Sequence, residues 1–192
     1  MSDEGSAGWA ASGLVEWVGV TVGRCSTWRG VIAALVGVVG SVGGLAWRQA
    51  RLSGLDLLDS RGWYTPDEAA VLFDSLDRLD ASALAVYATT ALTIDMVFPA
   101  TYGLLFAMLL LRMFRGRAPL YLLPVTGALA DALENVTVAA LALSHDGAPS
   151  PLAWAAGVFT SAKTVLFVAT LCVICVGGIG WMGQRLSRRQ FR

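Results

Sequence analysis

The sequence predicts an all-α membrane protein, a bundle of four transmembrane helices with one further amphipathic helix at its surface. Of its 192 residues, 56% are hydrophobic and 15% are charged, whereas about a quarter of the residues in a typical soluble domain are charged. Four apolar stretches also reach the ~20 residues that a helix needs to cross the hydrocarbon core of a bilayer. The formal net charge is zero, so we expect no nucleic-acid partner, because nucleic acid attracts proteins mainly through basic charge.

Residues 1–29 are predicted to form an N-terminal arm. Inside it, residues 9–23 make a weak apolar run that is short for a span and carries Glu16. We interpret this run as an interfacial helix or a frayed arm, and a fifth membrane crossing is the alternative.

The first predicted span covers residues 30–47, which include no charged residue. Small side chains repeat along nearly one face of this helix, a pattern that lets two backbones approach closely; they are Ala33, Gly37, Ser41 and Gly44. We expect this face to pack tightly against another span, and the alternative is that it lines a substrate path.

The polar segment 48–80 contains the amphipathic helix, which is predicted over about residues 66–78. Thr65 and Glu68 form a capping box around Pro66 at the first helical position, a combination that starts helices. Apolar residues then recur at helical spacing. We expect this helix to lie on the membrane surface as a connector, and a lid over a cavity is the alternative.

The remaining spans are predicted over residues 82–111, 119–143 and 151–182. The first of these three contains Pro99, which lacks a backbone donor and frees the carbonyl oxygen of Asp95, so a kink is expected near Asp95. The last is longer than a bilayer requires, and it is expected to tilt or to project from the membrane.

Arginine placement predicts the orientation of the chain. Four crossings place nine arginines on one side and four on the other, and the positive-inside rule assigns the arginine-rich side, with both termini, to the cytoplasm. Residues 30–183 then form one transmembrane domain, and residues 184–192 form a basic cytoplasmic tail. Arg48 and Arg51 fall in the polar segment on the arginine-poor side, against the positive-inside rule.

Four ionisable side chains lie deep in the predicted spans: Asp95 in the second, Asp131 and Glu134 in the third, and Lys163, the only lysine, in the fourth. At a rise of about 1.5 Å per residue, all four fall at a similar depth. Such groups cost roughly 2.5–3.5 kcal/mol each on insertion, which makes them candidates for function. We expect them to converge on a shared cavity in which Lys163 neutralises one carboxylate.

The predicted cluster has three acids for one base, so at least one carboxyl group is expected to lack a cation. A desolvated carboxyl of this kind favours its protonated form and can act as a general acid near neutral pH. Asn135 shares a helix face with Asp131 and Glu134 through the i, i+3, i+4 spacing. The alternative interpretation is a structural network of ion pairs and hydrogen bonds that locks the bundle.

Other motifs are less informative. The sequence has no metal-ligand spacing, phosphate-binding loop or Ser-His-Asp order, so we expect no metal and no cofactor. His145, beside Asp146, is interpreted as a solvated loop histidine, and Cys172 and Cys175 are interpreted as packing residues.

Two short motifs carry a family resemblance. Residues 95–103 read Asp-x-x-Phe-Pro-x-x-Tyr-Gly, and residues 131–135 read Asp-x-x-Glu-Asn. Over about residues 48–163, the chain resembles a group of small bacterial four-helix membrane proteins and is similar to the membrane terpene cyclases of drimentine-type indole sesquiterpenoid pathways. The resemblance implies a bacterial inner-membrane location, a prenylated small-molecule substrate, and proton-initiated cyclisation of a farnesyl or other prenyl chain without a metal.

The resemblance also implies roles for individual residues. Asp95 is the first choice of general acid, and Asp131 and Glu134 are a second candidate and its tuning partner. Asn135 is expected to orient these acids, and Lys163 completes the polar substrate-binding set. Aromatic faces stabilise carbocations through cation–π attraction, and the candidates are Tyr87, Phe98, Tyr102, Phe106, Trp154 and Phe159.

Two other functions are compatible with the same residues. A proton-coupled small-molecule transporter also uses membrane carboxylates and a lysine, and four helices per chain then favour a homo-oligomer. A non-catalytic isoprenoid- or lipid-binding protein needs the cavity but no surplus acid.

Overall fold

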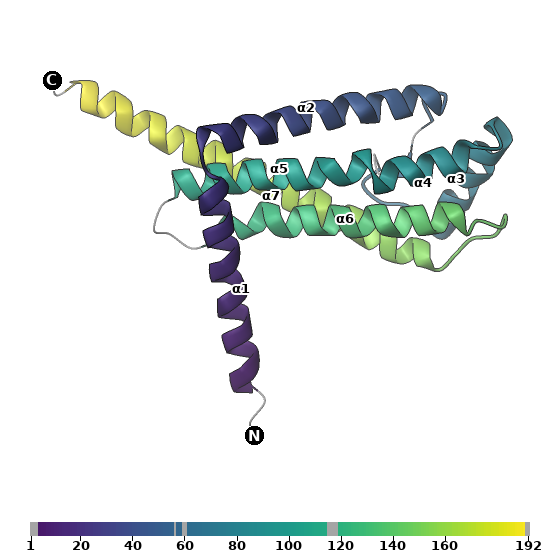
Figure 1. The fold of residues 1–192 in the computed structure, drawn as a ribbon, viewed down its shortest axis with the longest axis horizontal. Helices are drawn as coiled ribbons and strands as arrows, with labels where there is room; N and C mark the ends of the chain where they lie inside the picture. The colour runs from purple at the N-terminus through teal and green to yellow at the C-terminus, as the bar shows by residue number, and fades with distance from the viewer. Residues whose placement is uncertain (1–3, 56, 59–60, 115–118, 191–192) are drawn as a thin grey trace.

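Seven helices make up the part of the chain that the computed structural model describes, namely residues 4–55, 57–58, 61–114 and 119–190 (Figure 1). They are α1 (Glu4–Cys25), α2 (Trp28–Arg51), α3 (Pro66–Leu79), α4 (Ala83–Leu92), α5 (Ile94–Met113), α6 (Leu122–Leu143) and α7 (Leu152–Gln190). No strand occurs among the described residues, which confirms the all-α class. Side chains are described within residues 13–179 of those ranges, so Arg115, Arg117 and the tail 184–192, which contribute to the predicted orientation, lie outside them.

Four helical segments are long and apolar enough to cross a membrane, as predicted. They are Trp28–Arg51, Ala83–Met113, Leu122–Leu143 and Leu152–Ile179, and the second consists of α4 and α5. The rest of α7 extends away from the bundle (Figure 1). The chain is therefore a multi-pass membrane protein.

The spans alternate in direction, so each one is antiparallel to the next along the chain (Figure 1). We call the end of the bundle at Trp28, Met113 and Leu122 the basal end, and the end at Arg51 and Leu143 the distal end. α5 packs against both α2 and α6, and α6 packs along α7. The interior of the bundle is therefore formed mainly where α5 and α6 face their neighbours.

The small side chains of α2 allow a close approach to α5, as the sequence predicts. A methyl group added at Gly44 would lie 2.6 Å from Cγ2 of Ile94, and one added at Gly37 would overlap the side chain of Thr101. Ser41 is buried on the same face. The tight-packing interpretation of this face is therefore confirmed for its central and distal parts.

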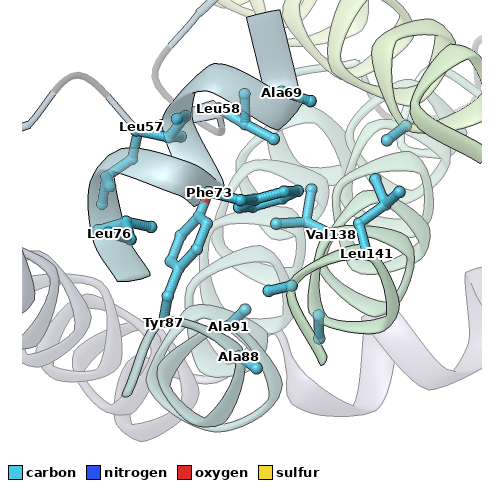
Figure 2. Close-up of a cluster of buried hydrophobic side chains, with 14 of the residues drawn as sticks. Leu57, Leu58, Ala69, Phe73, Leu76, Tyr87, Ala88, Ala91, Val138 and Leu141 are labelled. Carbon is cyan, nitrogen blue, oxygen red and sulfur yellow. The ribbon is translucent and has the colours of Figure 1, made fainter. Parts of the chain in front are cut away.

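The amphipathic helix α3 covers the distal end of the bundle. Thr65 caps it as predicted: its hydroxyl accepts the backbone N–H of Glu68, and its own N–H donates to the Glu68 carboxylate at 2.7 Å. The apolar face of α3 is buried, and Figure 2 shows Phe73 pointing toward α4 and α6, next to Val138. The main hydrophobic core therefore lies between α3, α4 and the distal half of α6.

α1 crosses the basal end of the bundle and does not run along it (Figure 1). Its Val22 is buried against Ala107 and Met108 of α5. The Tyr121 hydroxyl donates to the carbonyl oxygen of Val15 at 3.0 Å, which attaches the middle of α1 to the start of α6. This transverse direction is the one that an interfacial helix takes, and α1 is not one of the four spanning segments.

Candidate functional site

The second span is broken where α4 ends and α5 begins. Thr93, at the junction, has φ −120° and ψ −84°, which is outside the helical region. The break lies two residues before Asp95, close to the kink that the sequence predicts. Pro99 cannot donate to the Asp95 carbonyl oxygen, and Asn135 of α6 donates its side-chain amide to that oxygen at 3.0 Å. The two motifs found in the sequence therefore meet through this hydrogen bond.

The carboxylate of Asp95 faces α2, where it forms a buried ion pair with Arg48. Arg48 Nη1 lies 3.0 Å from Asp95 Oδ2, and the two side chains are 4% and 6% exposed. The Arg48 guanidinium also lies over the ring of Tyr87, 5.5 Å from its centroid. The sequence assigns Arg48 to the polar segment after the first span, whereas in the structure α2 continues to Arg51 and Arg48 is buried against α5.

A second charged group, which we call the triad, is formed by Asp131, Glu134 and Lys163. The ammonium of Lys163 lies 2.9 Å from Asp131 Oδ1 and 2.7 Å from Glu134 Oε2. Thr160 donates its hydroxyl to the other Glu134 oxygen at 2.8 Å. The i, i+3 spacing on α6 brings the two carboxylates to one face, and the same spacing on α7 brings Thr160 and Lys163 to meet them.

The sequence predicts that all three acids gather around Lys163, and the structure differs from this prediction. Asp95 faces Arg48 on α2, whereas Asp131 and Glu134 face Lys163 on α7. Among the described spans, the buried acids number three, and two cations are within ion-pair distance of them. The surplus carboxyl group belongs to the triad, in which two carboxylates share one ammonium.

An apolar groove of about 290 Å³ lies beside the triad, where α5, α6 and α7 meet. It is lined by Phe98, Tyr102, Asp131, Lys163, Thr164 and Phe167. Val165 and Val168, next to lining residues on α7, are 67% and 53% exposed, so this side of the bundle faces lipid in a membrane. Asp131 reaches the groove, whereas Glu134 is 0% exposed and lies behind it.

Aromatic rings form one wall of the groove. Tyr102 contacts Phe98, Phe106 and Phe167, with ring centroids 5.0, 6.0 and 5.4 Å apart. The Tyr102 hydroxyl also interacts with the Asp131 carboxylate. Phe167 is not among the aromatic residues predicted from the sequence, although it follows Lys163 by four residues and so lies on the same face of α7.

Of the predicted aromatic residues, Phe106 packs on Tyr102 and Phe167 without lining the groove, and three others lie elsewhere. Tyr87 is fully buried in the distal core, beneath Arg48 and near Phe73. Trp154 is 49% exposed and packs against Trp63 of the distal loop, with ring centroids 5.9 Å apart. Phe159 is half-buried and is not among the residues that line the groove.

His145 is not the solvated residue that the sequence analysis expected. Its side chain is 6% exposed, and its Nε2 lies 2.9 Å from Asp74 Oδ1 of α3. Its ring also packs against Phe73 at 5.4 Å. The prediction of a solvated histidine was wrong because its partner, Asp74, lies 71 residues away in the sequence.

Comparisons with models of protein families, with curated proteins and with solved structures find no match for this chain. Among the described residues, no three His, Cys, Asp or Glu side chains are grouped so that they can hold a metal ion.

Proposed function

We propose that this chain is an integral-membrane terpene cyclase that protonates a prenyl chain, with the Asp131–Glu134 pair as the proton source. The observation that supports this proposal is that two carboxylates share the single ammonium of Lys163 at the edge of an aromatic, apolar groove. Two adjacent carboxylates with one cation favour a state in which they hold one proton between them. That proton is available to a bound substrate.

The reaction balances without a co-reactant. Asp131, which lines the groove, transfers its proton to one carbon of a substrate alkene, and a carbocation forms at the other carbon. The electrons of a second alkene then close a ring, and loss of a proton from the resulting cation restores an alkene and returns the proton to the carboxylate pair. The product is an isomer of the substrate. Throughout the cycle, Glu134 shares the proton with Asp131, and the Lys163 ammonium compensates the negative charge that Asp131 carries after it gives up that proton.

The sequence-based choice of Asp95 as the acid is not retained in this proposal. Its carboxylate lies against the Arg48 guanidinium at 3.0 Å, and a neighbouring cation favours the ionised form, which has no proton to give. We assign Asp95 and Asn135 a positioning role, since their hydrogen bond fixes α6 beside the start of α5.

The groove suits an apolar chain and its cationic intermediates. Its volume of about 290 Å³ lies near the lower limit of the ~300–1,000 Å³ that is typical of small-molecule sites. The rings of Phe98, Tyr102 and Phe167 line it, and a well-placed aromatic face stabilises a cation by roughly 0.5–2 kcal/mol. Because the groove lies on a lipid-facing side, a prenylated substrate can enter it from the bilayer.

The test is conversion of farnesylated indole substrates by the purified chain in lipid nanodiscs. We expect a product of unchanged mass and altered retention. In D₂O the product gains one deuterium, because the proton returned to the carboxylate pair exchanges with solvent before the next turnover. Asp131→Asn should abolish conversion, whereas Asp77→Asn, at an exposed position of α3, serves as the matched control. Retention of the full rate by Asp131→Asn, or deuterium-free product from the unaltered chain, contradicts the proposal.

A proton-coupled transporter is the second candidate, and it is favoured by the same shared ammonium. A carboxylate pair with one lysine can gain and lose a proton as a substrate binds. In liposomes, a transporter gives substrate flux that drives proton movement and leaves the substrate chemically unchanged. A cyclase gives the isomer without net proton movement, so the two assays separate the candidates.

A further inference from the structure

A second apolar cavity, which we call the slot, lies under α1 on a different face of α5 and α6 from the groove. It measures about 270 Å³. Small residues of the spans form its floor, among them Ala100, Gly103 and Ala128, and Trp17 and Thr21 of α1 form its roof. The Thr21 hydroxyl is already bonded to the Trp17 carbonyl at 2.9 Å, so the slot presents an almost wholly apolar lining.

The slot is structurally well defined, because hydrogen bonds fix α1 at both ends of its contact with the spans. The Tyr121 hydroxyl holds the Val15 carbonyl at 3.0 Å, and Gly19 permits this approach, since a methyl group there would lie 2.7 Å from that hydroxyl. After α1 ends, Arg112 of α5 donates to the hydroxyl and the carbonyl of Ser26 at 2.8 and 2.7 Å. These contacts keep α1 across the basal end of α5 and α6.

The slot is continuous with the lipid-facing surface of the protein. Leu129 and Leu133 of α6, which follow the slot-lining Ala128, are 60% and 42% exposed. On α1, Leu14 and Trp17 are 63% and 65% exposed. Tryptophan and leucine on a transverse helix are typical of a segment that lies at the interface of a bilayer. Hydrocarbon is therefore the medium that reaches the slot.

The charged side chains near the corner where α1 joins α2 favour the binding of an anionic lipid headgroup. Arg24 at the end of α1, Arg29 at the start of α2 and Arg112 near the end of α5 all lie at the basal end, and all three are exposed. Within residues 13–25 of α1, where side chains are described, the one acid is Glu16. Guanidinium groups bind phosphate oxygens through paired hydrogen bonds, so this surface matches a phospholipid phosphate.

We propose that the slot binds one acyl chain of an anionic glycerophospholipid whose headgroup lies against Arg24 and Arg29. The acyl chain occupies the space between α1 and the Gly103–Ala128 contact, and the phosphate lies at the corner where α1 joins α2. This inference does not depend on the proposed enzymatic activity, because the slot and the groove have different linings.

The test uses the full chain in detergent, with phosphatidylglycerol and phosphatidylcholine of identical acyl chains as probes. Native mass spectrometry and thermal unfolding measure retention and stabilisation. We expect phosphatidylglycerol to bind at least about tenfold more tightly, since two basic residues each favour an anionic lipid. Ala100→Trp fills the slot from its exposed side and should abolish binding of both lipids, whereas Ala46→Trp, exposed on α2, should change neither.

A double variant, Arg24→Gln with Arg29→Gln, tests the headgroup contact separately. It should retain lipid but lose the preference for phosphatidylglycerol. A variant that loses lipid through misfolding is recognised by a lower unfolding temperature before any lipid is added, and Ala128→Leu then replaces Ala100→Trp as the slot-filling change. Equal binding of the two lipids by the unaltered chain, or unchanged binding in the folded slot-filling variant, overturns the proposal.

Discussion

The side-chain amide of Asn135 takes the place of the backbone donor that Pro99 lacks, by bonding to the Asp95 carbonyl oxygen at 3.0 Å. One hydrogen bond thus satisfies a buried polar group of α5 and joins it to α6. Asn135 is 1% exposed, so water is a poor substitute for either partner.

Removing this bond should destabilise the protein by an amount that depends on Pro99. Asn135→Leu leaves a buried carbonyl oxygen unsatisfied, and we expect the free energy of unfolding to fall by about 1–3 kcal/mol. In a Pro99→Ala background, the introduced alanine supplies a backbone N–H to the Asp95 carbonyl oxygen, so the same change should cost less. A double-mutant cycle measured by denaturant unfolding checks this, and equal costs in both backgrounds would show that the bond does not replace the missing donor.

The Arg48–Asp95 pair should behave as a coupled unit. Arg48→Met or Asp95→Leu alone removes one partner of a buried ion pair, and each should cost about 3–5 kcal/mol. The double variant should be more stable than either single one, because no buried charge is left without its counterpart. Thermal unfolding in detergent measures all four proteins, and simple additivity would argue against the coupling.

On α7, a phenylalanine that lines the groove should contribute to the proposed reaction, and one that does not line it should contribute little. Phe167→Leu removes a ring from the groove, and we expect turnover to fall about 2- to 30-fold, which corresponds to a lost cation–π contribution of roughly 0.5–2 kcal/mol. Phe159→Leu, a matched change away from the groove lining, should leave turnover nearly unchanged. Equal effects of both changes would remove the basis for assigning a cationic intermediate to this wall.

The capping box of α3 should respond to acidic pH. Hydrogen bonds from the backbone and side chain of Thr65 lower the pKa of Glu68, with a smaller contribution from Arg61. Because the folded-state pKa is below the unfolded value, the stabilisation is present above the unfolded pKa and is lost as pH falls through the folded one. We expect Glu68→Gln to remove this part of the pH dependence, as seen in thermal unfolding between neutral and acidic pH. A parallel pH profile for both proteins would contradict the assignment.

Neighbouring glycines of α2 should respond oppositely to alanine. At Gly43 an added methyl meets nothing within 4 Å, so Gly43→Ala should stabilise the helix by about 0.5–1 kcal/mol. At Gly44 it would lie 2.6 Å from Ile94 Cγ2, and the overlap should cost about 1–3 kcal/mol. Unfolding measurements on the two variants give the comparison, and stabilisation by both would show that α2 and α5 can separate without cost.

Much of the fold was predictable, because the signals that define it are local. Length and apolar content identify the spans, and the Thr65–Glu68 capping box marks the start of α3 from residues only three positions apart. The shared face of Asp131, Glu134 and Asn135 also follows from helical periodicity alone. All three are buried on α6, as that periodicity requires.

The site was less predictable, because its pairings depend on how helices rotate against each other. Arg48 follows the last apolar residue of the first predicted span, where a charged residue usually indicates the membrane surface, and its partner lies 47 residues away. Phe167 is one of several aromatic residues in apolar segments. Its spacing of four residues from Lys163 places it on the same face of α7, but that spacing does not indicate that this face meets Tyr102. Helix rotation also decides that Asp95 faces α2 while Asp131 faces α7.

The two buried charge groups have a consequence for membrane insertion. Arg48 and Asp95 belong to the first and second spans, and Lys163 and its two carboxylates belong to the third and fourth. Each hairpin of successive spans therefore contains both signs of charge. The buried charges of one hairpin can pair with each other before the other hairpin is inserted. The translocation machinery can release the chain into lipid two segments at a time, so a mutation that leaves one charge alone should impair biogenesis before it impairs the assembled molecule.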